Sequence, residues 1–307
     1  MTNFFSRHFN LEKVSEGIYA AIAKDGGGAI GNAGFIDLGD KTIVFDTFNT
    51  QQAAEDLRNI AESITNTPVS WVINSHFHGD HIRGNQVFKD CNIVSSQTTL
   101  QQMKENHPER IAEQKADIAG LKKYIESLTK QNEGSNDIQK KNEINFLREI
   151  EISLPNLELV LPQFTFTNDF TIIGTKRTAR VITLGGGHTP CDAFLYLPED
   201  EIIFMGDLLF VRMYPSFFSY SNPTQWVNIL HEVKNLPIQK AIPGHGPVGT
   251  NEDIDRLINY INEMKILSKQ NMNTEEVSIP EEYKEWATVN VDARELFIRN
   301  LNVLKEL

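Results

Sequence analysis

The sequence predicts an α/β fold, in which short β-strands alternate with longer α-helices. Two observations carry this prediction. Short apolar runs rich in β-branched and aromatic residues lie between clusters of Gly, Pro, Asn and Asp, as is typical of strands. Longer stretches place apolar residues three and four positions apart, which is typical of amphipathic helices. With 307 residues and an apolar content of 40%, the chain can bury the core that a layered fold requires.

The N-terminal half of the chain begins with a run of strands within residues 14–48. Gly39 and Asp40 lie between two apolar runs and predict a hairpin turn. A helix with one apolar face and two further strands follow. The elements expected here are a helix at 50–65 and strands at 17–23, 32–38, 42–47, 69–74 and 92–95.

Residues 97–153 differ from the rest of the chain, because they are polar and rich in Lys, Glu and Gln. Apolar residues recur at helical spacing over 111–128 and again over 138–150, and the polar segment 131–136 separates the two stretches. The sequence therefore predicts a helical hairpin inserted into the α/β unit. We expect it to cap an active site or to form a homodimer contact. The alternative is a solvated excursion with a narrow apolar seam.

The C-terminal half returns to strands and helices in alternation. Helices are expected at 225–235 and 254–268, and strands at 157–160, 164–166, 170–173, 180–184, 194–197, 202–205 and 240–242. The last part, 274–307, is acidic and then helical. We therefore expect a single domain over 1–307, with residues 268–307 as a C-terminal helical extension.

The segment SHFHGDH, residues 75–81, directly follows a predicted strand. Side chains on a loop that a rigid strand holds are well placed to bind ligands. Because alternate residues of a turn can point the same way, His76 and His78 can share one ion, while Asp80 and His81 can reach a second. Imidazole and carboxylate groups are usual ligands of zinc and related metals. The segment therefore predicts a metal site.

Three later segments each carry one metal-binding side chain after a predicted strand, in a turn marked by glycine. They are GGGHTP with His188, MGD with Asp207 and PGHG with His245. Sheets of α/β proteins build their sites at the C-terminal ends of strands, and glycine permits the tight turns. Each segment alone has an ordinary interpretation, a simple turn or, for Asp207, a helix N-cap. Together with residues 75–81, they favour a shared metal site.

With these motifs the chain resembles the metallo-β-lactamase superfamily. HFHGDH matches the HxHxDH signature, and GHTP, GD and PGHG resemble the later motifs in the same order. The resemblance covers roughly residues 15–250 without the helical insertion. It implies a four-layer αββα sandwich and two divalent metal ions, most often Zn²⁺, with Fe or Mn as alternatives.

The resemblance also implies which ion each side chain binds. His76, His78 and His188 match the ligands of the first ion, Asp80, His81 and His245 those of the second, and Asp207 the carboxylate that bridges both. Asp46 matches an aspartate that stands behind the histidine-rich loop. With an aspartate at the bridging position, the chain resembles the glyoxalase II-like thioesterase, lactonase and phosphodiesterase branches. Classical lactam-cleaving members carry a cysteine at that position.

A chain with this resemblance is expected to be a binuclear metal-dependent hydrolase. A metal-bound hydroxide would attack a small ester, thioester or lactone, and Asp80 would bind metal and also relay a proton. Three alternatives stay open: a β-lactamase, a phosphodiesterase or nuclease, and a non-catalytic metal-binding module.

The segment 210–220 is unusually aromatic, and we expect it to line the substrate pocket. Tyr214 is predicted to act as a catalytic residue whose hydroxyl lies near the reacting oxygen, and Arg212 to bind an anionic group of the substrate. An apolar, aromatic pocket favours a small-molecule substrate. Cys191 closely follows a predicted metal ligand, and we interpret it as a packing residue rather than a reactive thiol.

The composition limits the partners and the compartment. A net charge of −12 without a block of Lys or Arg argues against a nucleic acid and against an anionic membrane surface. No apolar run is long enough to span a membrane, and the N-terminus lacks the apolar core of a signal peptide. The two cysteines lie far apart, so we expect a reduced, cytoplasmic protein. His8, His107 and His231 are interpreted as surface residues.

Overall fold

The computed structural model describes residues 4–270, 274–289 and 291–307. The chain divides into two compact units. The N-terminal unit comprises Met1–Phe166 and Gly174–Lys176, and the C-terminal unit comprises Thr167–Ile173 and Arg177–Leu307. Two predictions fall partly outside the described residues. The N-terminal segment, predicted to lack a signal peptide, includes residues 1–3, and the predicted C-terminal extension includes residues 271–273 and 290. The predicted domain boundaries stay a prediction.

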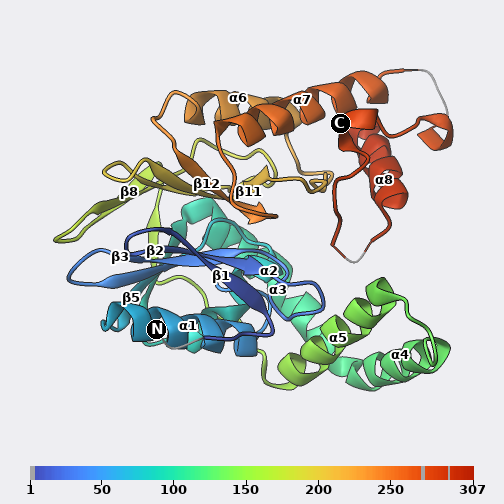
Figure 1. The fold of residues 1–307 in the computed structure, drawn as a ribbon, viewed down its shortest axis with the longest axis horizontal. Coiled ribbons are helices and arrows are strands. Elements are labelled where there is room, and N and C mark those ends of the chain that lie inside the picture. Colours follow the sequence, from blue (N-terminus) through green and yellow to red (C-terminus); the bar gives the residue numbers. More distant parts are fainter. Residues whose placement is uncertain (1–3, 271–273, 290) are drawn as a thin grey trace. The chain divides into compact units, whose positions relative to one another are not determined.

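The N-terminal unit is built on a seven-stranded sheet, drawn in Figure 1 with its helices. Its strands lie side by side in chain order: β1 (Phe9–Ser15), β2 (Ile18–Ala23), β3 (Ala33–Asp37), β4 (Thr42–Phe45), β5 (Val69–Ile73), β6 (Asn92–Ser96) and β7 (Phe164–Phe166). Neighbours from β1 to β4 are antiparallel, and those from β4 to β7 are parallel. The C-terminal ends of β4, β5 and β6 therefore meet at one edge, where the segment 75–81 begins.

Helix α1 (Gln51–Thr65) packs on this sheet through one apolar face. Ala53 and Leu57 are buried, and the Thr50 side chain accepts a hydrogen bond from the backbone N–H of Ala53, which caps the helix. The helix contacts β3, β4 and β5, and Figure 1 shows it along one face of the sheet. The predicted helix is confirmed.

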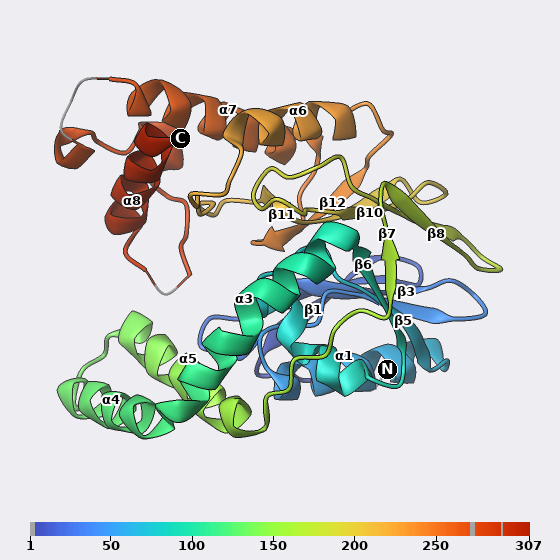
Figure 2. The same cartoon turned by 180° about the vertical axis from the view of Figure 1, so that it is seen from behind.

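The insertion consists of three helices rather than two. They are α3 (Gln97–Ala116), α4 (Ile118–Gln131) and α5 (Ile138–Ser153). The prediction of one continuous helix over 111–128 was wrong, because α3 ends at Asp117, whose side chain caps α4 by accepting from the backbone N–H of Gly120. Helices α4 and α5 pack side by side, as Figure 2 also shows.

The C-terminal unit is built on a five-stranded sheet in the order β12-β11-β10-β9-β8. Its strands are β8 (Asp169–Ile173), β9 (Thr178–Ile182), β10 (Phe194–Leu197), β11 (Ile202–Phe210) and β12 (Lys240–His245). β11 and β12 are parallel, and the other neighbours are antiparallel. The turn predicted at Gly206 and Asp207 is instead an irregularity inside β11, since the pairing register shifts on both sides of Gly206, which has φ +52°.

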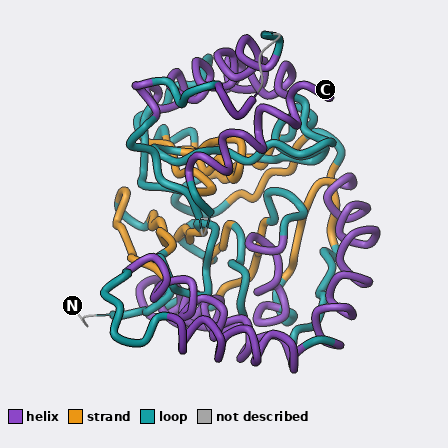
Figure 3. Tube along the Cα trace, turned by 90° about the vertical axis from the view of Figure 1, so that its right-hand side faces the viewer, coloured by secondary structure: helices purple, strands orange, loops and turns teal. Residues whose placement is uncertain are grey.

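Helices cover this second sheet. They are α6 (Pro223–Val233), α7 (Asn251–Ser268) and α8 (Ala293–Glu306). Helix α7 contacts α6, α8 and β11, and in Figure 3 the purple helices of this unit lie along its orange strands. Trp226, Tyr260 and Phe297 are fully buried in its core. Both units combine a sheet with packed helices, which confirms the predicted α/β class. In the described parts of the chain, no helix has the length and apolar character needed to cross a membrane.

Two strand predictions in the N-terminal unit need correction. Residues 157–160 were expected to form a strand because leucines alternate there, but these residues belong to no strand. Leu157 packs instead with helical residues in a small apolar cluster, and the Val160 carbonyl accepts a hydrogen bond from the Asn85 side chain. Strand β1 was not predicted, because it is an edge strand with mostly polar residues.

Candidate metal centre

The N-terminal unit carries four of the predicted ligands on the segment after β5. His76 and His81 are buried, and His78 is half-buried. The ring centroid of His76 lies 4.7 Å from that of His78 and 4.4 Å from that of His81. One ring nitrogen of His76 and one of His78 lie within 4.8 Å of each other, and Asp80 Oδ2 lies 3.6 Å from His81 Nε2. Two pairs of metal-binding groups therefore lie together on one loop.

Asp46, at the end of β4, holds this loop from behind. Its Oδ2 lies 2.8 Å from His81 Nδ1 and accepts from the Ser75 hydroxyl at 2.7 Å, while its Oδ1 accepts from the Ser75 backbone N–H at 2.8 Å. Burial raises the pKa of Asp46, and the contacts with His81 and Ser75 act in the opposite direction. Because Nδ1 of His81 faces Asp46, Nε2 is the nitrogen that would bind a metal. The position implied for Asp46 behind the loop is confirmed.

The C-terminal unit carries the other three predicted ligands. Asp207 lies on β11 and is 4% exposed, and its two carboxylate oxygens face different imidazoles. Its Oδ2 lies 3.2 Å from His188 Nε2, and its Oδ1 lies 3.4 Å from His245 Nε2. His245 ends β12, which runs parallel to β11, so the pairing of these two strands places it beside Asp207.

His188 lies on a loop without regular structure, which Asp192 holds in shape. The buried Asp192 carboxylate accepts hydrogen bonds from the backbone N–H of Gly187 at 2.9 Å, the backbone N–H of Thr189 at 2.8 Å and the Thr189 hydroxyl at 2.5 Å. The Ser221 hydroxyl donates to the His188 carbonyl at 2.7 Å. Sequence reasoning missed Asp192, although an aspartate three residues after a threonine is the kind of residue that closes a turn.

Aromatic rings surround the two histidines of this unit. Phe210 stacks on His245 with centroids 5.1 Å apart, and Trp226 and Phe218 meet the His188 ring edge-on at 5.2 and 5.6 Å. The segment 210–220 thus supplies two rings that pack against these histidines. That it lines a substrate pocket stays a prediction. Trp226 was missed, because it lies on α6 far along the sequence from His188.

Tyr214 belongs to the aromatic core of the C-terminal unit. It is 3% exposed, and its hydroxyl donates to the Tyr283 carbonyl. Burial raises the pKa of Tyr214 to about 12. Because this hydrogen bond uses the phenolic hydrogen, we do not include Tyr214 among the proposed catalytic groups. Arg212 is exposed, with φ +54°, and its role in substrate binding stays a prediction. Cys191 is buried beside the Thr189 hydroxyl, as a packing cysteine would be.

Two of the three histidines interpreted as surface residues are buried. His8 and His107 are each 2% exposed, whereas His231 is exposed as predicted. His8 Nδ1 accepts a hydrogen bond from the Gly28 backbone N–H at 3.0 Å. His107 Nε2 lies 2.6 Å from the Phe77 carbonyl and donates to it, so α3 of the insertion is tied to the metal-ligand loop. The prediction failed because this contact joins residues thirty positions apart.

Replacing His107 by phenylalanine is expected to lower the free energy of unfolding by about 1–3 kcal/mol, because the buried Phe77 carbonyl loses its donor. Burial lowers the pKa of His107, so the folded protein holds the neutral ring. The neutral ring contributes its full stability above about pH 6.5, the pKa of a histidine in the unfolded chain. This contribution is lost as the pH falls below that value.

Urea denaturation of the metal-free protein at about pH 7.5 and about pH 5.5 tests this expectation. Wild-type protein should lose more stability between the two pH values than the matched His107→Gln variant, which keeps a donor but does not titrate. Equal losses in both proteins would show that His107 is not held neutral.

The seven predicted ligands therefore lie in two groups, four on one loop of the N-terminal unit and three around Asp207 in the C-terminal unit. Both groups contain only imidazole nitrogens and carboxylate oxygens. These donors fit a divalent transition metal, and they fit Ca²⁺ poorly because that ion takes oxygen ligands. The chemistry of the side chains is thus that of a metal site.

Comparison with known proteins agrees with this chemistry. The model of the metallo-β-lactamase superfamily matches residues 26–245 of this chain. A metallo-β-lactamase type 2 from Bacteroides fragilis is 28% identical over 131 residues, which are 41% of this chain and 53% of that protein. The match therefore spans about half the length of this relative.

Solved structures share the fold. A metallo-β-lactamase from Pontibacter korlensis aligns with a TM-score of 0.60 at 17% identity, covering 83% of this chain and 99% of that one. The DIM-1 metallo-β-lactamase aligns with a TM-score of 0.58 at 17% identity, covering 83% and 98%. At these identities the likeness concerns the fold alone, and it confirms the predicted metallo-β-lactamase fold. Since the family model covers more than half of the sequence, the chain belongs to the metallo-β-lactamase superfamily.

Proposed function

We propose that this chain is a binuclear metal-dependent hydrolase of small esters, thioesters or lactones. The observation that carries the proposal is the position of Asp207, whose two oxygens face His188 and His245 at 3.2 and 3.4 Å. A carboxylate with one imidazole beside each oxygen is suited to bridge two cations about 3.5–4 Å apart.

The proposed ligand sets are those that the resemblance of the motifs implies. The first ion would take His76, His78 and His188, the second Asp80, His81 and His245, and Asp207 would serve both. Zinc is the proposed metal because imidazole nitrogen dominates both sets, with Fe or Mn as alternatives. Divalent ions held there would lower the pKa of water towards neutrality and draw charge from a carbonyl oxygen.

The chain's own residues supply orientation and proton transfer. The Asp80 side chain is 20% exposed, so water can reach it and it can accept a proton or pass it on. Asp46 fixes the ring of His81 through Nδ1. Phe210, Phe218 and Trp226 cover the histidines of the C-terminal unit and keep bulk water from them. No serine or cysteine nucleophile is required.

The aromatic surroundings and the net charge of −12 support a small acyl substrate over a nucleic acid. A β-lactam is the second candidate substrate, because the sequence relative and the solved neighbours described above are metallo-β-lactamases. The proposed bridging role of Asp207 favours the small acyl substrate, because a bridging aspartate is a feature in which the chain resembles the thioesterase and lactonase branches.

Removal of the metal is expected to abolish hydrolysis, and zinc is expected to restore it. The measurement is the rate of turnover of an ester, a thioester, a lactone, nitrocefin and a phosphodiester before and after dialysis against a chelator, with zinc, manganese or iron added back. Metal content and the rise in melting temperature on adding zinc give a second readout, because a ligand of the native state stabilises it.

The substrate panel separates the alternatives. Nitrocefin turnover as fast as that of the lactone would favour a β-lactamase, and phosphodiester turnover a nuclease. Binding of two ions without turnover of any substrate would indicate a non-catalytic module. Activity that survives complete metal removal would contradict the proposed function.

Two further proposals concern the surroundings of the enzyme. A homodimer contact through the insertion is supported by the exposed apolar side chains Ile138 and Ile152, and sedimentation at increasing concentration tests it.

A cytoplasmic location is supported by the two buried free cysteines, Cys91 and Cys191, and cell fractionation tests it.

A further inference from the structure

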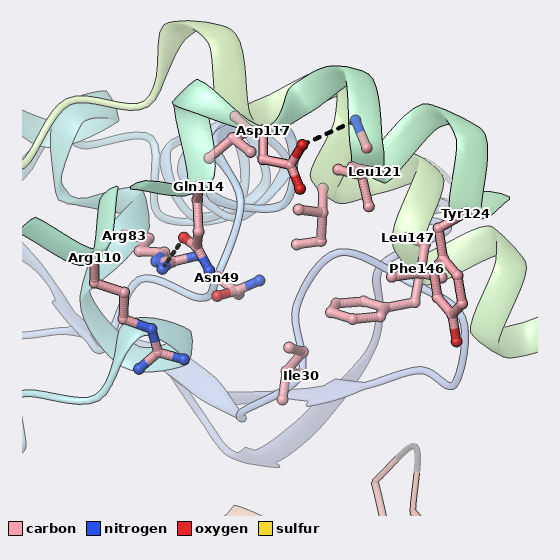
Figure 4. A pocket seen from close by; sticks show the side chains of 13 residues that line it. Ile30, Asn49, Arg83, Arg110, Gln114, Asp117, Leu121, Tyr124, Phe146 and Leu147 are labelled. Atoms are coloured by element: carbon pink, nitrogen blue, oxygen red, sulfur yellow. Dashed lines mark hydrogen bonds between the residues drawn. The ribbon is translucent and has the colours of Figure 1, made fainter. Parts of the chain in front are cut away.

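A cavity of about 550 Å³ lies in the N-terminal unit, between the insertion helices α3, α4 and α5 and the loops around the metal-ligand segment. Figure 4 shows Arg83 and Arg110 at one end and Tyr124, Phe146 and Leu147 at the other. Its volume is within the usual range for small-molecule sites, which is about 300–1,000 Å³. The two ends differ in chemistry, and each end restricts the ligand that can fit.

The first end is cationic. Arg83 is 7% exposed, and its Nη2 donates to Oε1 of Gln114 at 2.8 Å, a neutral amide rather than a carboxylate. Its buried Nε has no hydrogen-bond partner among the described residues. A buried guanidinium is costly unless an anion pairs with it, so this end of the cavity is suited to an anionic group.

One anionic side chain of the chain itself also lines the cavity. The Asp117 carboxylate caps α4 by accepting from the Gly120 backbone N–H at 3.2 Å, and it lies close against Gly120. Two arginines and this one carboxylate are the charged residues of the lining, so the lining keeps an excess of positive charge.

The second end of the cavity is apolar. Leu121 and Tyr124 from α4 and Phe146, Leu147 and Ile150 from α5 line it. Helices α4 and α5 pack side by side, and their apolar faces form the walls seen in Figure 4. An alkyl chain or an aromatic ring would bury apolar surface there, at a gain of roughly 25 cal/mol per Å².

The cavity shares its wall with the metal-ligand loop. A Cβ atom placed on Gly79 of that loop would lie 2.8 Å from Arg83 Nε. Ile30 lines the cavity with φ +67°, a rare conformation for a β-branched residue, and a Cβ on the next residue, Gly31, would lie 2.6 Å from His81 Nε2. A molecule held at Arg83 would therefore lie beside the loop that carries His81, a proposed ligand of the second ion.

We propose that this cavity binds an amphipathic anion, with its carboxylate, phosphate or sulfate group at Arg83 and Arg110 and its alkyl or aromatic group between α4 and α5. Binding of such a molecule does not depend on the proposed function. That these molecules are the substrates of the hydrolase is an inference that rests on the proposed function.

Isothermal titration calorimetry with octanoate tests the proposal on metal-free and zinc-loaded protein. Octanoate should bind at least about tenfold more tightly than octan-1-ol or octylamine, because a guanidinium pairs well with a carboxylate. Arg110→Gln should weaken octanoate binding about tenfold, and Arg83→Gln by more. The matched control is Arg148→Gln on α5, an exposed arginine outside the cavity, and it should bind octanoate like wild type. Octyl phosphate and octyl sulfate identify the preferred head group.

A second variant keeps the proposal testable if Arg83→Gln does not fold. Leu147→Asn should remove the gain in affinity of octanoate over butyrate while leaving butyrate binding unchanged. Equal affinity for octanoate and octan-1-ol, or an equal loss in the Arg148→Gln control, would overturn the proposal.

The two proposals fail in different ways. Octanoate binding without turnover of any substrate would leave the cavity assigned and contradict the hydrolase. Fast turnover of neutral esters without octanoate binding would contradict the cavity assignment alone. If both hold, Arg110→Gln should lower kcat/KM about tenfold more for an ester that carries a carboxylate than for the matching neutral ester.

Discussion

Replacing Asp207 by asparagine is expected to lower kcat by about 100-fold or more, the loss seen when one electrostatic group is removed from an active site. Asparagine keeps the shape of the side chain but supplies one neutral oxygen in place of two anionic ones. The oxygen facing His188 and the oxygen facing His245 can then no longer both bind a cation. The bound metal should fall from two ions per chain to one or none.

The stability of the Asp207→Asn variant separates lost function from lost folding. Asp207 is a buried carboxylate, and replacing a buried charge by a neutral group of the same size often costs little stability. Metal-free variant and wild type should therefore unfold at similar urea concentrations, while the stabilisation that zinc gives to wild type should be lost. Asp169→Asn, on exposed β8 of the same unit, is the matched control. A variant that keeps two ions and full activity would contradict the bridging role.

The sequence was informative where a residue's role depends on its own segment. His76, His78, Asp80 and His81 lie together because they are neighbours in the chain, and the strand before them was visible as a short β-branched run. His245 was predictable for a related reason, since it ends a strand that is parallel to the strand of Asp207. Local pattern and strand pairing therefore account for the positions of most of the predicted ligands in each unit.

Roles that depend on distant contacts were not predictable in this way. His107 contacts the carbonyl of Phe77, and Arg83 contacts Gln114 on the same helix α3, so both need the position of the insertion. The surroundings of Tyr214 also depend on a distant contact. This residue is close to Asp207 in sequence, but β11 continues to Phe210, and the chain then leads Tyr214 to the carbonyl of Tyr283.

The break between α3 and α4 depends on a local signal that the apolar pattern hides. Apolar residues continue at helical spacing across Asp117, and this periodicity predicts one helix. Asp117 nevertheless ends α3 and caps α4, because an aspartate can bond the backbone N–H groups of a new helix. The cavity of the N-terminal unit lies beside this break, since Asp117 and Gly120 line it. Periodicity alone therefore could not predict the cavity.

Replacing Asp46 by asparagine is expected to weaken zinc binding about 10- to 100-fold, the usual effect of removing a group that orients a metal ligand. Three donors converge on the two oxygens of Asp46, namely His81 Nδ1–H and the hydroxyl and backbone N–H of Ser75. Asparagine offers one oxygen, and its amide group would face a donor. At least one buried donor then lacks an acceptor, at a cost of about 1–3 kcal/mol in the free energy of unfolding.

Asparagine is the informative substitution because of the backbone. Asp46 has φ +60°, which asparagine tolerates and alanine does not, so Asp46→Ala would add strain to the loss of the carboxylate. The control is Asp37→Asn in the same unit, which breaks an ion pair with the exposed Lys176 and should cost less than about 1 kcal/mol. Zinc affinity measured by competition with a chelator, together with urea denaturation, decides the outcome. If Asp46→Asn loses stability but keeps wild-type zinc affinity, Asp46 supports the fold of the loop without orienting His81 for the metal.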